Sequence, residues 1–385
     1  MSSKPNILHI STPKSWRGGE QQLSYLFEEL NTRGINQYIL CRKNSEMAIR
    51  GKEKGWNIIE CKKRTAIDPI FAEKVKSVCN LKNIDIIHTH DSHAHSFAVL
   101  SAMLFGNKTP IIVSRRVDFA IKQTLFSKLK YNHKNVKRIL CVSDAIKALT
   151  IPDIENKSIV KTIHSGINID RFPFQKSECN KLRTEFNIPN SVKIVGNVAA
   201  ISPHKDYFTF IDTVKQLVDI GVNSKFLIIG TGPSEKEIKE YACKQKMDDH
   251  IIFTGFRSDI PEILPELDIF LITSETEGLG TSVIDAFACK VPVVGTKAGG
   301  IPELVKHEKS GLIAPVKDAK ELAHQVHRIL KNEINLETMI ASQQEILKCD
   351  NSLALLLRLL YRLSLLMDNP SLNDNYLPAR VTLIR

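Results

Sequence analysis

The fold is decided by residues 274–303, Ser-Glu-Thr-Glu-Gly-Leu-Gly-Thr-Ser-Val-Ile-Asp-Ala-Phe-Ala-Cys-Lys-Val-Pro-Val-Val-Gly-Thr-Lys-Ala-Gly-Gly-Ile-Pro-Glu. Two acidic residues, Glu277 and Asp285, are separated by seven residues. Gly278 and Gly280 between them open a segment with the pattern of a helix, and a short apolar run and a second glycine turn follow. This order of turn, helix, strand and turn is typical of an α/β domain.

The start of this predicted helix is suited to binding an anion. The first N–H groups of a helix have no partner within it, and the helix dipole is positive there. Thr281 and Ser282 add hydroxyl groups, and Asp285 lies about one turn further on, near enough to reach a bound ligand. We therefore predict a site for a molecule that carries phosphate and many hydroxyl groups.

Strand and helix patterns alternate along the whole chain, which predicts parallel, doubly wound sheets. The strand patterns are residues 6–10, 38–41, 84–88, 110–114 and 139–142, and then 193–198, 225–230, 251–254, 269–273 and 292–295. Two such series predict two Rossmann-like domains that face each other across a cleft, with ligands at the carboxyl ends of the strands. We assign residues 1–175 to the first domain, 176–342 to the second, and 343–385 to an atypical leucine-rich helix and tail.

Size and charge narrow the functional classes. A chain of 385 residues with 43% hydrophobic residues can form two cores. A net charge of +11 fits nucleic acid, an anionic membrane or acidic substrates. No basic run with interleaved aromatic residues occurs, so a nucleic-acid partner is not expected. The lysine-rich segment 122–137 is compatible with either a solvated helix face or a membrane-facing patch.

The cysteines and the N-terminus indicate a cytoplasmic protein. The eight cysteines are scattered without a CxxC pair, so neither a zinc nor a redox site is predicted. The first ten residues are a polar lead into a strand and do not have the pattern of a signal peptide. No stretch of about 18 uncharged apolar residues occurs, so no membrane span is expected.

Two motifs outside the opening stretch carry glycine or a cation after a predicted strand. Gly18-Gly19 is either a close approach to a ligand or a plain turn, and it lacks the GxGxxG pattern of NAD sites. Lys205, after the strand 193–198, is either a point charge for phosphate or a surface lysine. Gly232 and Arg257 also follow strands and are weaker candidates for a place near a nucleotide, since a tight structural turn explains them equally well.

The histidines and arginines of the first half leave alternatives open. The group His88, His90, His93 and His95 matches no known metal spacing, and no Asp-x-Asp motif for Mg²⁺ occurs, so no metal is predicted. His90 is either a cleft residue that binds sugar hydroxyls or part of a polar strand end. Arg115 and Arg116 either hold an anionic acceptor or a leaving phosphate, or form an ion pair with Asp118.

With these motifs in place, residues 5–342 resemble the retaining glycosyltransferases of family 4, which have the GT-B fold. The resemblance rests mainly on the Glu-x7-acid spacing and the Gly-Gly-x-Pro-Glu turn of the opening stretch, supported by residues 18–19, 166–172, 205, 230–233 and 255–257. The resemblance implies that Glu277 contacts the donor sugar, Asp285 contacts the ribose and Lys205 contacts the diphosphate. It also implies that Gly18 and Gly19 approach the leaving phosphate and that Gly232 and Arg257 lie near the base. Backbone N–H groups for the donor are implied at Gly278, Leu279, Gly280 and Thr281.

The chain departs from the family pattern in several places. Asp285 stands where the family usually has Glu, which shortens its reach by about 1.5 Å, the length of one C–C bond. Ala200 stands where many members have an arginine, and Arg115-Arg116 stand where members often have a histidine. The leucine-rich segment 353–367 is either the helix that crosses back to the first domain in the family or a membrane-surface helix.

Together with the resemblance, these features predict a retaining, metal-independent, hexosyltransferase-type glycosyltransferase without a cofactor. We expect it to move a sugar from a nucleotide-diphosphate sugar to a glycan or lipid-linked acceptor in cell-envelope polysaccharide or lipopolysaccharide synthesis, at the inner face of the cytoplasmic membrane. Its predicted catalytic residues are Glu277, Lys205, Arg116 and His90. The alternatives are a non-catalytic protein that binds sugar nucleotides and a nucleotide-sugar epimerase of the same fold.

Overall fold

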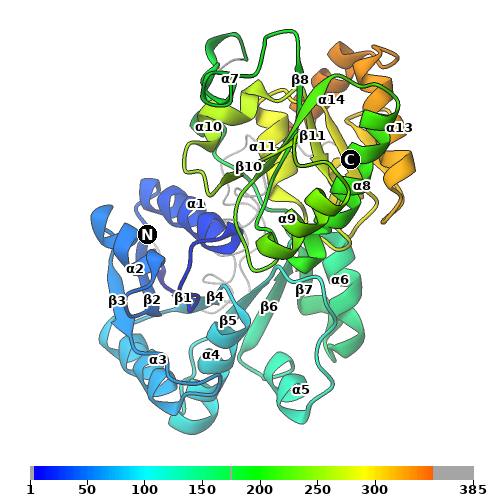
Figure 1. Ribbon diagram of the computed structural model, residues 1–385. Coiled ribbons are helices and arrows are strands. Elements are labelled where there is room, and N and C mark those ends of the chain that lie inside the picture. Colours follow the sequence, from blue (N-terminus) through cyan, green and yellow to red (C-terminus); the bar gives the residue numbers. More distant parts are fainter. Residues whose placement is uncertain (1–3, 174–175, 350–385) are drawn as a thin grey trace. The chain divides into compact units, whose positions relative to one another are not determined.

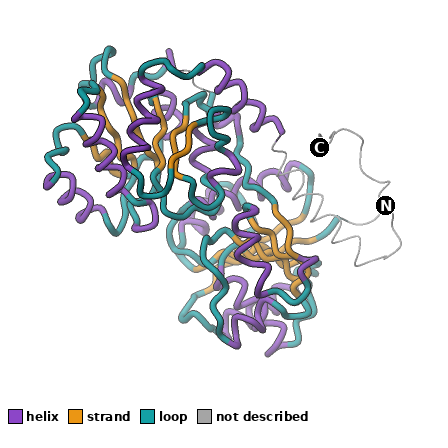
Figure 2. The backbone as a smooth tube through the Cα atoms, turned by 90° about the vertical axis from the view of Figure 1, so that its right-hand side faces the viewer, coloured by secondary structure: helices purple, strands orange, loops and turns teal. Residues whose placement is uncertain are grey.

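The computed structural model describes residues 4–173 and 176–349. They form two parallel β-sheets in which helices alternate with strands along the chain (Figure 1). Figure 2 shows helices against both faces of each sheet. The predicted α/β class with two parallel sheets is therefore confirmed.

The first sheet has seven strands in the order β3-β2-β1-β4-β5-β6-β7. These strands are β1 (Asn6–Ser11), β2 (Asn36–Arg42), β3 (Ile58–Cys61), β4 (Ile86–Thr89), β5 (Ile111–Arg115), β6 (Val136–Cys141) and β7 (Val160–Thr162). β1 pairs in parallel with β2 on one side and β4 on the other, so the strand order reverses between β1 and β4. In such sheets the loops beyond the carboxyl ends of the strands at this reversal leave room for a ligand.

The second sheet has six strands in the order β10-β9-β8-β11-β12-β13. They are β8 (Lys193–Val198), β9 (Ser224–Ile229), β10 (Ile251–Gly255), β11 (Ile269–Ile272), β12 (Val293–Thr296) and β13 (Leu312–Ala314). Its order reverses between β8 and β11. Buried side chains of these strands, such as Phe226 and Leu271, pack with those of α8 and α13 in one apolar core, which fixes the strand ends that carry the site.

Helices connect the strands on both faces. They are α1 (Gly18–Thr32), α2 (Glu46–Glu53), α3 (Pro69–Leu81), α4 (Ser92–Phe105), α5 (Leu125–Tyr131), α6 (Asp144–Thr150), α7 (Lys181–Glu185), α8 (Tyr207–Asp219), α9 (Glu235–Lys244), α10 (Ile260–Ile263), α11 (Thr281–Ala288), α12 (Ile301–Leu304), α13 (Ala319–Leu330) and α14 (Leu336–Cys349). Within the described chain, no helix combines the length and the apolar character that crossing a bilayer requires.

The chain divides into two compact units that do not coincide with the two sheets. One unit contains residues 4–15 and 26–112, with β1 to β4, and the other contains residues 16–25 and 113–349, with β6 to β13. The predicted domains 1–175 and 176–342 follow the sheets and stay a prediction. Most of the predicted tail 343–385, including the leucine-rich segment 353–367, lies outside the described residues.

The sequence patterns found the central strands and missed three edge strands. β3, β7 and β13 each lie at the edge of a sheet. β3 has no fully buried residue, and β7 is only three residues long. An edge strand packs on one neighbour only and needs no continuous apolar run, so periodicity gives little signal there.

Candidate functional site

The turn that carries Glu277 leads directly into a helix, as predicted. α11 begins at Thr281, and its N-cap is Gly280, whose φ of 88° lies in the left-handed region that favours glycine. Because Gly280 has no side chain, no side-chain cap bonds the first amides of α11. This helix start therefore keeps N–H groups available for a ligand.

The glycine turn at the end of the opening stretch packs directly on the backbone of Glu277. Gly299 has a φ of +49°, and a Cβ atom built on it would lie 1.9 Å from the Glu277 carbonyl oxygen. The Gly300 amide donates a hydrogen bond of 3.0 Å to this same oxygen, and a Cβ on Gly300 would lie 2.5 Å from the carbonyl oxygen of Gly278. The two glycine-bearing parts of the motif thus form one packed unit.

Lys205 and Glu277 meet at this turn, although 72 residues separate them. Their side chains form an ion pair and are only 16% and 14% exposed. The hydroxyl of Ser274 donates to the same carboxylate oxygen over 3.2 Å. The Thr273 hydroxyl donates to the carbonyl oxygens of Lys205 and Asp206, which holds this loop against the end of β11. A carboxylate and an ammonium group are therefore fixed beside the start of α11.

Asp285 lies on α11, one turn beyond Thr281, and is partly buried. Its removal from water raises the pKa of its carboxyl group to about 7, and the positive charge of Arg171 opposes this shift. Near neutral pH the carboxyl group is thus present in both protonation states, so it can donate as well as accept a hydrogen bond.

The structure brings four further predicted residues together beside α11. The Arg116 Nη1 atom donates to the Gly19 carbonyl oxygen over 2.9 Å. A Cβ on Gly18 would lie 3.8 Å from the Thr281 hydroxyl oxygen, and a Cβ on Gly278 would lie 2.7 Å from the Arg116 carbonyl oxygen. The start of α1, the residue after β5 and the start of α11 therefore meet at one place.

The two neighbouring arginines have different roles. Arg115 is 3% exposed, and its guanidinium donates to the hydroxyls of Thr150 and Tyr131 and to the Phe119 carbonyl oxygen. The donor atoms of Arg115 are thus used for contacts within the protein. Arg116, by contrast, contacts the Gly18-Gly19 turn. Among the described residues, neither arginine forms the alternative ion pair with Asp118.

The weaker candidates have structural explanations. A Cβ on Gly232 would lie 2.1 Å from the Ile201 carbonyl oxygen, so a close approach of two loops requires this glycine. Arg257 forms ion pairs of 2.7 Å with Glu185 and Asp259. Its charge is therefore already balanced, whereas its neighbour Phe256 is 70% exposed and offers an aromatic face. A direct contact of Gly232 or Arg257 with a nucleotide stays a prediction.

One contact of the opening stretch was not predicted. Glu303, its last residue, accepts hydrogen bonds of 2.9 Å from the amides of Asp144 and Ala145 at the start of α6. It also contacts the His164 Nε2 atom at 2.8 Å. An acid after proline at a helix start is a weak signal that could have indicated a capping role, but nothing in the sequence indicated that the capped helix would be α6.

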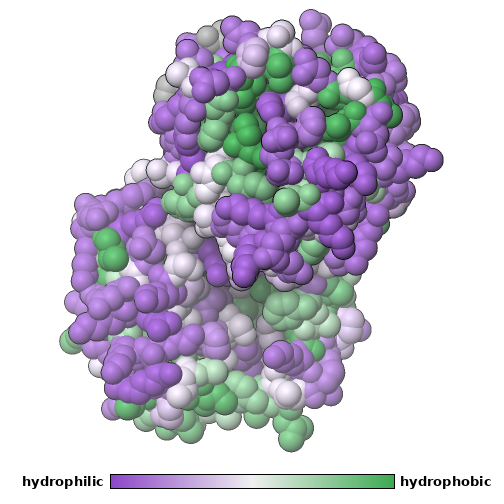
Figure 3. Space-filling view, viewed as in Figure 1, coloured by the Kyte–Doolittle hydropathy of each residue, from purple (hydrophilic) through white to green (hydrophobic). Residues whose placement is uncertain are grey.

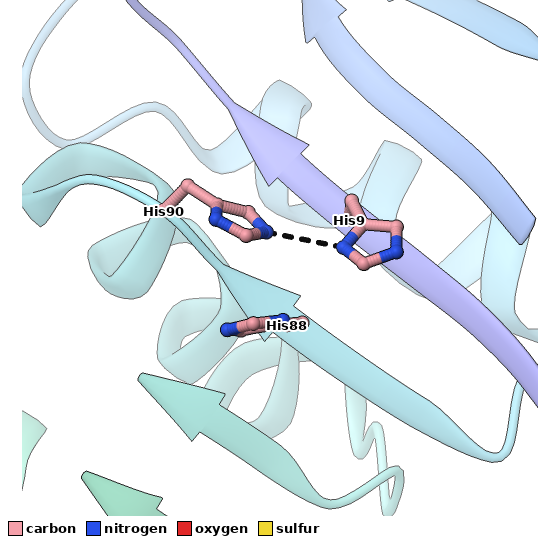
Figure 4. Close-up of side chains that lie close together, drawn as sticks. All are labelled: His9, His88 and His90. Carbon is pink, nitrogen blue, oxygen red and sulfur yellow. Dashed lines mark hydrogen bonds between the residues drawn. The ribbon is translucent and has the colours of Figure 1, made fainter. Parts of the chain in front are cut away.

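Three histidines of the first sheet form a buried cluster (Figure 4). His9 on β1 and His88 on β4 are partners across the two strands, and His90 follows two residues after His88. His93 and His95 lie on α4 instead. The Gln37 amide donates to the Phe27 carbonyl oxygen, so its own oxygen faces the His9 Nε2 atom at 3.2 Å. His9 therefore carries its proton on Nε2, and its Nδ1 atom accepts from the His90 Nε2 atom over 3.1 Å.

Hydrogen bonds link this cluster from Gln37 through His9 to His90. The ligand nitrogens of the three rings lie within 4.8 Å of one another, a spacing that an ion can bridge. In this structure, however, both nitrogens of His9 are already hydrogen-bonded, one to Gln37 and one to His90. We therefore interpret His9 as a neutral ring whose tautomer is set by Gln37.

Comparison with known proteins identifies the family. A model of the glycosyl transferases group 1 matches residues 179–345, and a model of glycosyltransferase family 4 matches residues 16–171. The chain belongs to the family 4 glycosyltransferases. This glycosyltransferase is 26% identical over 271 residues to N-acetyl-alpha-D-glucosaminyl L-malate synthase of Bacillus anthracis, covering 69% of this chain and 70% of the relative.

A second relative and two solved structures agree with this family. UDP-Gal:alpha-D-GlcNAc-diphosphoundecaprenol alpha-1,3-galactosyltransferase of Escherichia coli is 19% identical over 86% of this chain and 89% of its own. The structure of Anabaena Alr3699/HepE in complex with UDP matches with a TM-score of 0.80 and 18% identity, covering 93% of this chain and 98% of that one. A glycosyltransferase from Rickettsia africae matches with a TM-score of 0.82 and 19% identity, covering 96% and 100%. The fold of this glycosyltransferase is GT-B.

Replacing Gly299 by alanine tests the packing of the two glycine turns. The variant must adopt a left-handed backbone and also move a methyl group away from the Glu277 carbonyl oxygen. We expect a loss of unfolding free energy of at least about 3 kcal/mol, measured by urea denaturation. Gly221→Ala is the matched control, because Gly221 has a φ of +79° but open space around it, and should lose about 1 kcal/mol. Equal losses in the two variants would show that the close approach is unimportant.

Acid should destabilise the protein through His9. Burial lowers the pKa of this imidazole from 6.5 to about 4, so the unfolded chain takes up the proton first as the pH falls below 6.5. The contribution of His9 to the free energy of unfolding should therefore be about 2.5 kcal/mol smaller at pH 4.5 than at pH 7. Urea denaturation at both pH values should show this loss in the wild type and in His324→Asn, whose histidine is exposed, but less of it in His9→Asn. An unchanged loss in His9→Asn contradicts the assignment.

Proposed function

We propose that this glycosyltransferase transfers a sugar from a UDP-sugar to a glycan or lipid-linked acceptor with retention of configuration and without a metal. The observation that carries the proposal is the pair of Lys205 and Glu277 fixed beside the start of α11. The UDP complex of HepE, which has the same fold, supports UDP as the nucleotide. The diphosphoundecaprenol acceptor in the name of the Escherichia coli relative supports a lipid-linked acceptor.

In this proposal the donor replaces an internal contact of the site. Lys205 exchanges part of its contact with Glu277 for the donor diphosphate, and the free amides of α11 bind the same phosphates. The Glu277 carboxylate then accepts hydrogen bonds from hydroxyls of the donor sugar. Asp285 binds the ribose hydroxyls, and its pKa of about 7 lets it donate or accept there. Ground-state pairing of Lys205 with Glu277 keeps both groups in place until the donor arrives.

The transfer itself needs positioned charges and no protein nucleophile. The bond between the anomeric carbon and the phosphate oxygen breaks, and the acceptor oxygen forms its new bond on the same face of the sugar. The acceptor proton passes to the departing phosphate oxygen, and Lys205 and the α11 amides stabilise the negative charge that develops there. A retaining hydrolase, by contrast, places two carboxyl groups about 5 Å apart across the sugar. His90 is proposed in this scheme as a hydrogen-bonding group for sugar hydroxyls.

We further propose that a surface around α5 contacts an anionic membrane that holds the acceptor. Phe119, Leu125 and Leu129 are 54%, 89% and 43% exposed. Exposed lysines alternate with them, at positions 122, 128, 134 and 137. Figure 3 shows hydrophobic side chains beside hydrophilic ones in the region of α5. Apolar side chains that enter a lipid interface and lysines that stay at its charged surface both favour binding, the latter by about 1 kcal/mol each.

Binding of UDP tests the donor site. Calorimetry should show that Lys205→Ala binds UDP at least about tenfold more weakly than the wild type, because one charge-assisted contact is lost. Lys236→Ala is the control, since this lysine is 90% exposed on α9. Unchanged binding by Lys205→Ala would remove Lys205 from the site. The anomeric configuration of the product, determined by NMR, should equal that of the donor, and an inverted product would refute the retaining mechanism.

Sedimentation with vesicles tests the membrane surface. The wild type should bind vesicles of phosphatidylcholine with anionic phosphatidylglycerol, and less so as salt increases. Leu125→Asp should bind at least about fivefold more weakly, because a buried leucine is worth roughly 1.5–3 kcal/mol. Leu81→Asp is the matched control, as Leu81 is 75% exposed at the end of α3. The surface is wrong if the wild type stays in the supernatant at low salt or if both variants bind alike.

A further inference from the structure

Arg116 is a positively charged side chain held at the junction of three elements. It follows β5, its Nη1 atom donates to the Gly19 carbonyl oxygen near the start of α1, and its own carbonyl oxygen lies against Gly278 before α11. One hydrogen bond to a neutral carbonyl group fixes the direction of the guanidinium. That single bond does not account for the five N–H donors that an arginine carries.

The unused donors of Arg116 point to a missing partner. Its Nε atom is shielded from water and has no hydrogen-bond acceptor among the described residues. Arg115 next to it differs, because its Nε, Nη1 and Nη2 atoms each donate to a protein oxygen. A shielded N–H without an acceptor is costly, so its retention indicates an acceptor that the protein itself does not provide.

The electrostatic surroundings indicate that this acceptor is an anion. The start of α1 and the start of α11 approach each other at Gly18 and Thr281, and each carries the positive end of a helix dipole. Lys205 is already paired with Glu277. Burial lowers the pKa of Arg116 only to about 10, and the negative charge of Glu20 opposes that shift, so the guanidinium keeps its charge at neutral pH. The guanidinium is thus charged before any ligand arrives, with the Glu20 carboxylate and the positive ends of two helix dipoles in its surroundings.

We propose that Arg116 binds an anionic oxygen group of the substrates, a phosphate or a carboxylate, through its Nε–H and one terminal N–H group. The two parallel donors of a guanidinium match two oxygens of either group. This inference rests on the proposed function, because the anion belongs to the donor or to the acceptor. It gives Arg116 a binding role that Lys205 cannot fulfil, because a lysine offers a point charge and not a planar pair of donors.

The two sources of the anion can be distinguished. If the group is the donor diphosphate, Arg116 stabilises the leaving charge together with Lys205. If the group is a carboxylate of the transferred sugar or of the acceptor, Arg116 selects which substrate is used and leaves UDP binding unaffected. The relative whose name contains L-malate makes malate a suitable carboxylate probe.

The test compares Arg116→Gln and Arg116→Lys with the wild type in calorimetric titrations. Glutamine removes the charge, and lysine keeps the charge but not the paired donors. The probes are UDP, uridine, inorganic pyrophosphate and malate, each at low and at moderate salt. Arg33→Gln is the matched control, because this arginine is 54% exposed on the surface. Thermal denaturation of each variant without ligand reports whether the contact with Gly19 matters for folding.

We expect at least about a tenfold loss of affinity in Arg116→Gln for UDP and pyrophosphate, or else for malate, with a smaller loss in Arg116→Lys. Uridine binding should not change in either variant. A loss confined to UDP and pyrophosphate identifies the diphosphate, and a loss confined to malate identifies a carboxylate. The proposal is overturned if the affinities for all the anions equal those of the wild type, or if no anion binds the wild type.

Failure of the proposed function would look different. If the wild type binds pyrophosphate or malate through Arg116 but does not bind UDP, the anion site is supported and the assignment of UDP as the nucleotide is refuted. If UDP binds the wild type and all the Arg116 variants equally well, UDP remains the nucleotide. This role of Arg116 is then refuted, provided that malate binding is also unchanged.

Discussion

The site depends on a contact between two stretches of backbone. The Gly299-Gly300 turn lies so close to the Glu277 carbonyl oxygen that no side chain fits at Gly299, and the Gly300 amide bonds that oxygen. This contact fixes the peptide from which the Glu277 side chain projects. Because the same carboxylate binds Lys205, the position of the ammonium group also follows from the glycine turn.

The charges of the site are arranged around this fixed peptide. Lys205 and Glu277 balance each other, while Arg116 and the starts of α1 and α11 contribute positive potential beside them. A diphosphate that enters such a site meets donors that are already oriented, so little reorganisation is needed as charge develops on the leaving group. The same arrangement explains why a metal is not required in the proposed mechanism.

The sequence was sufficient to predict the α/β fold and the helix that begins after Gly278 and Gly280, because these follow from strand periodicity and from glycines at fixed spacing. It was not sufficient to separate Arg115 from Arg116. Successive residues of an extended chain point to opposite sides, and only the packing of Thr150 and Tyr131 around Arg115 shows which side is internal. The contact of Glu303 with the start of α6 was also unpredictable, because 159 residues separate Asp144 from Glu303.

The four predicted catalytic residues share one geometric property. His90 follows β4, Arg116 follows β5, Lys205 lies in the loop after β8, and Glu277 follows β11. Each therefore lies beyond the carboxyl end of a parallel strand, where the fold places ligands. Position alone cannot assign their chemistry, since the fold puts many kinds of side chain there. The partners decide it: the His90 Nε2 atom is hydrogen-bonded to His9, whose other nitrogen contacts Gln37. The charged guanidinium of Arg116, by contrast, has a shielded Nε atom without an acceptor among the described residues and suits an anion.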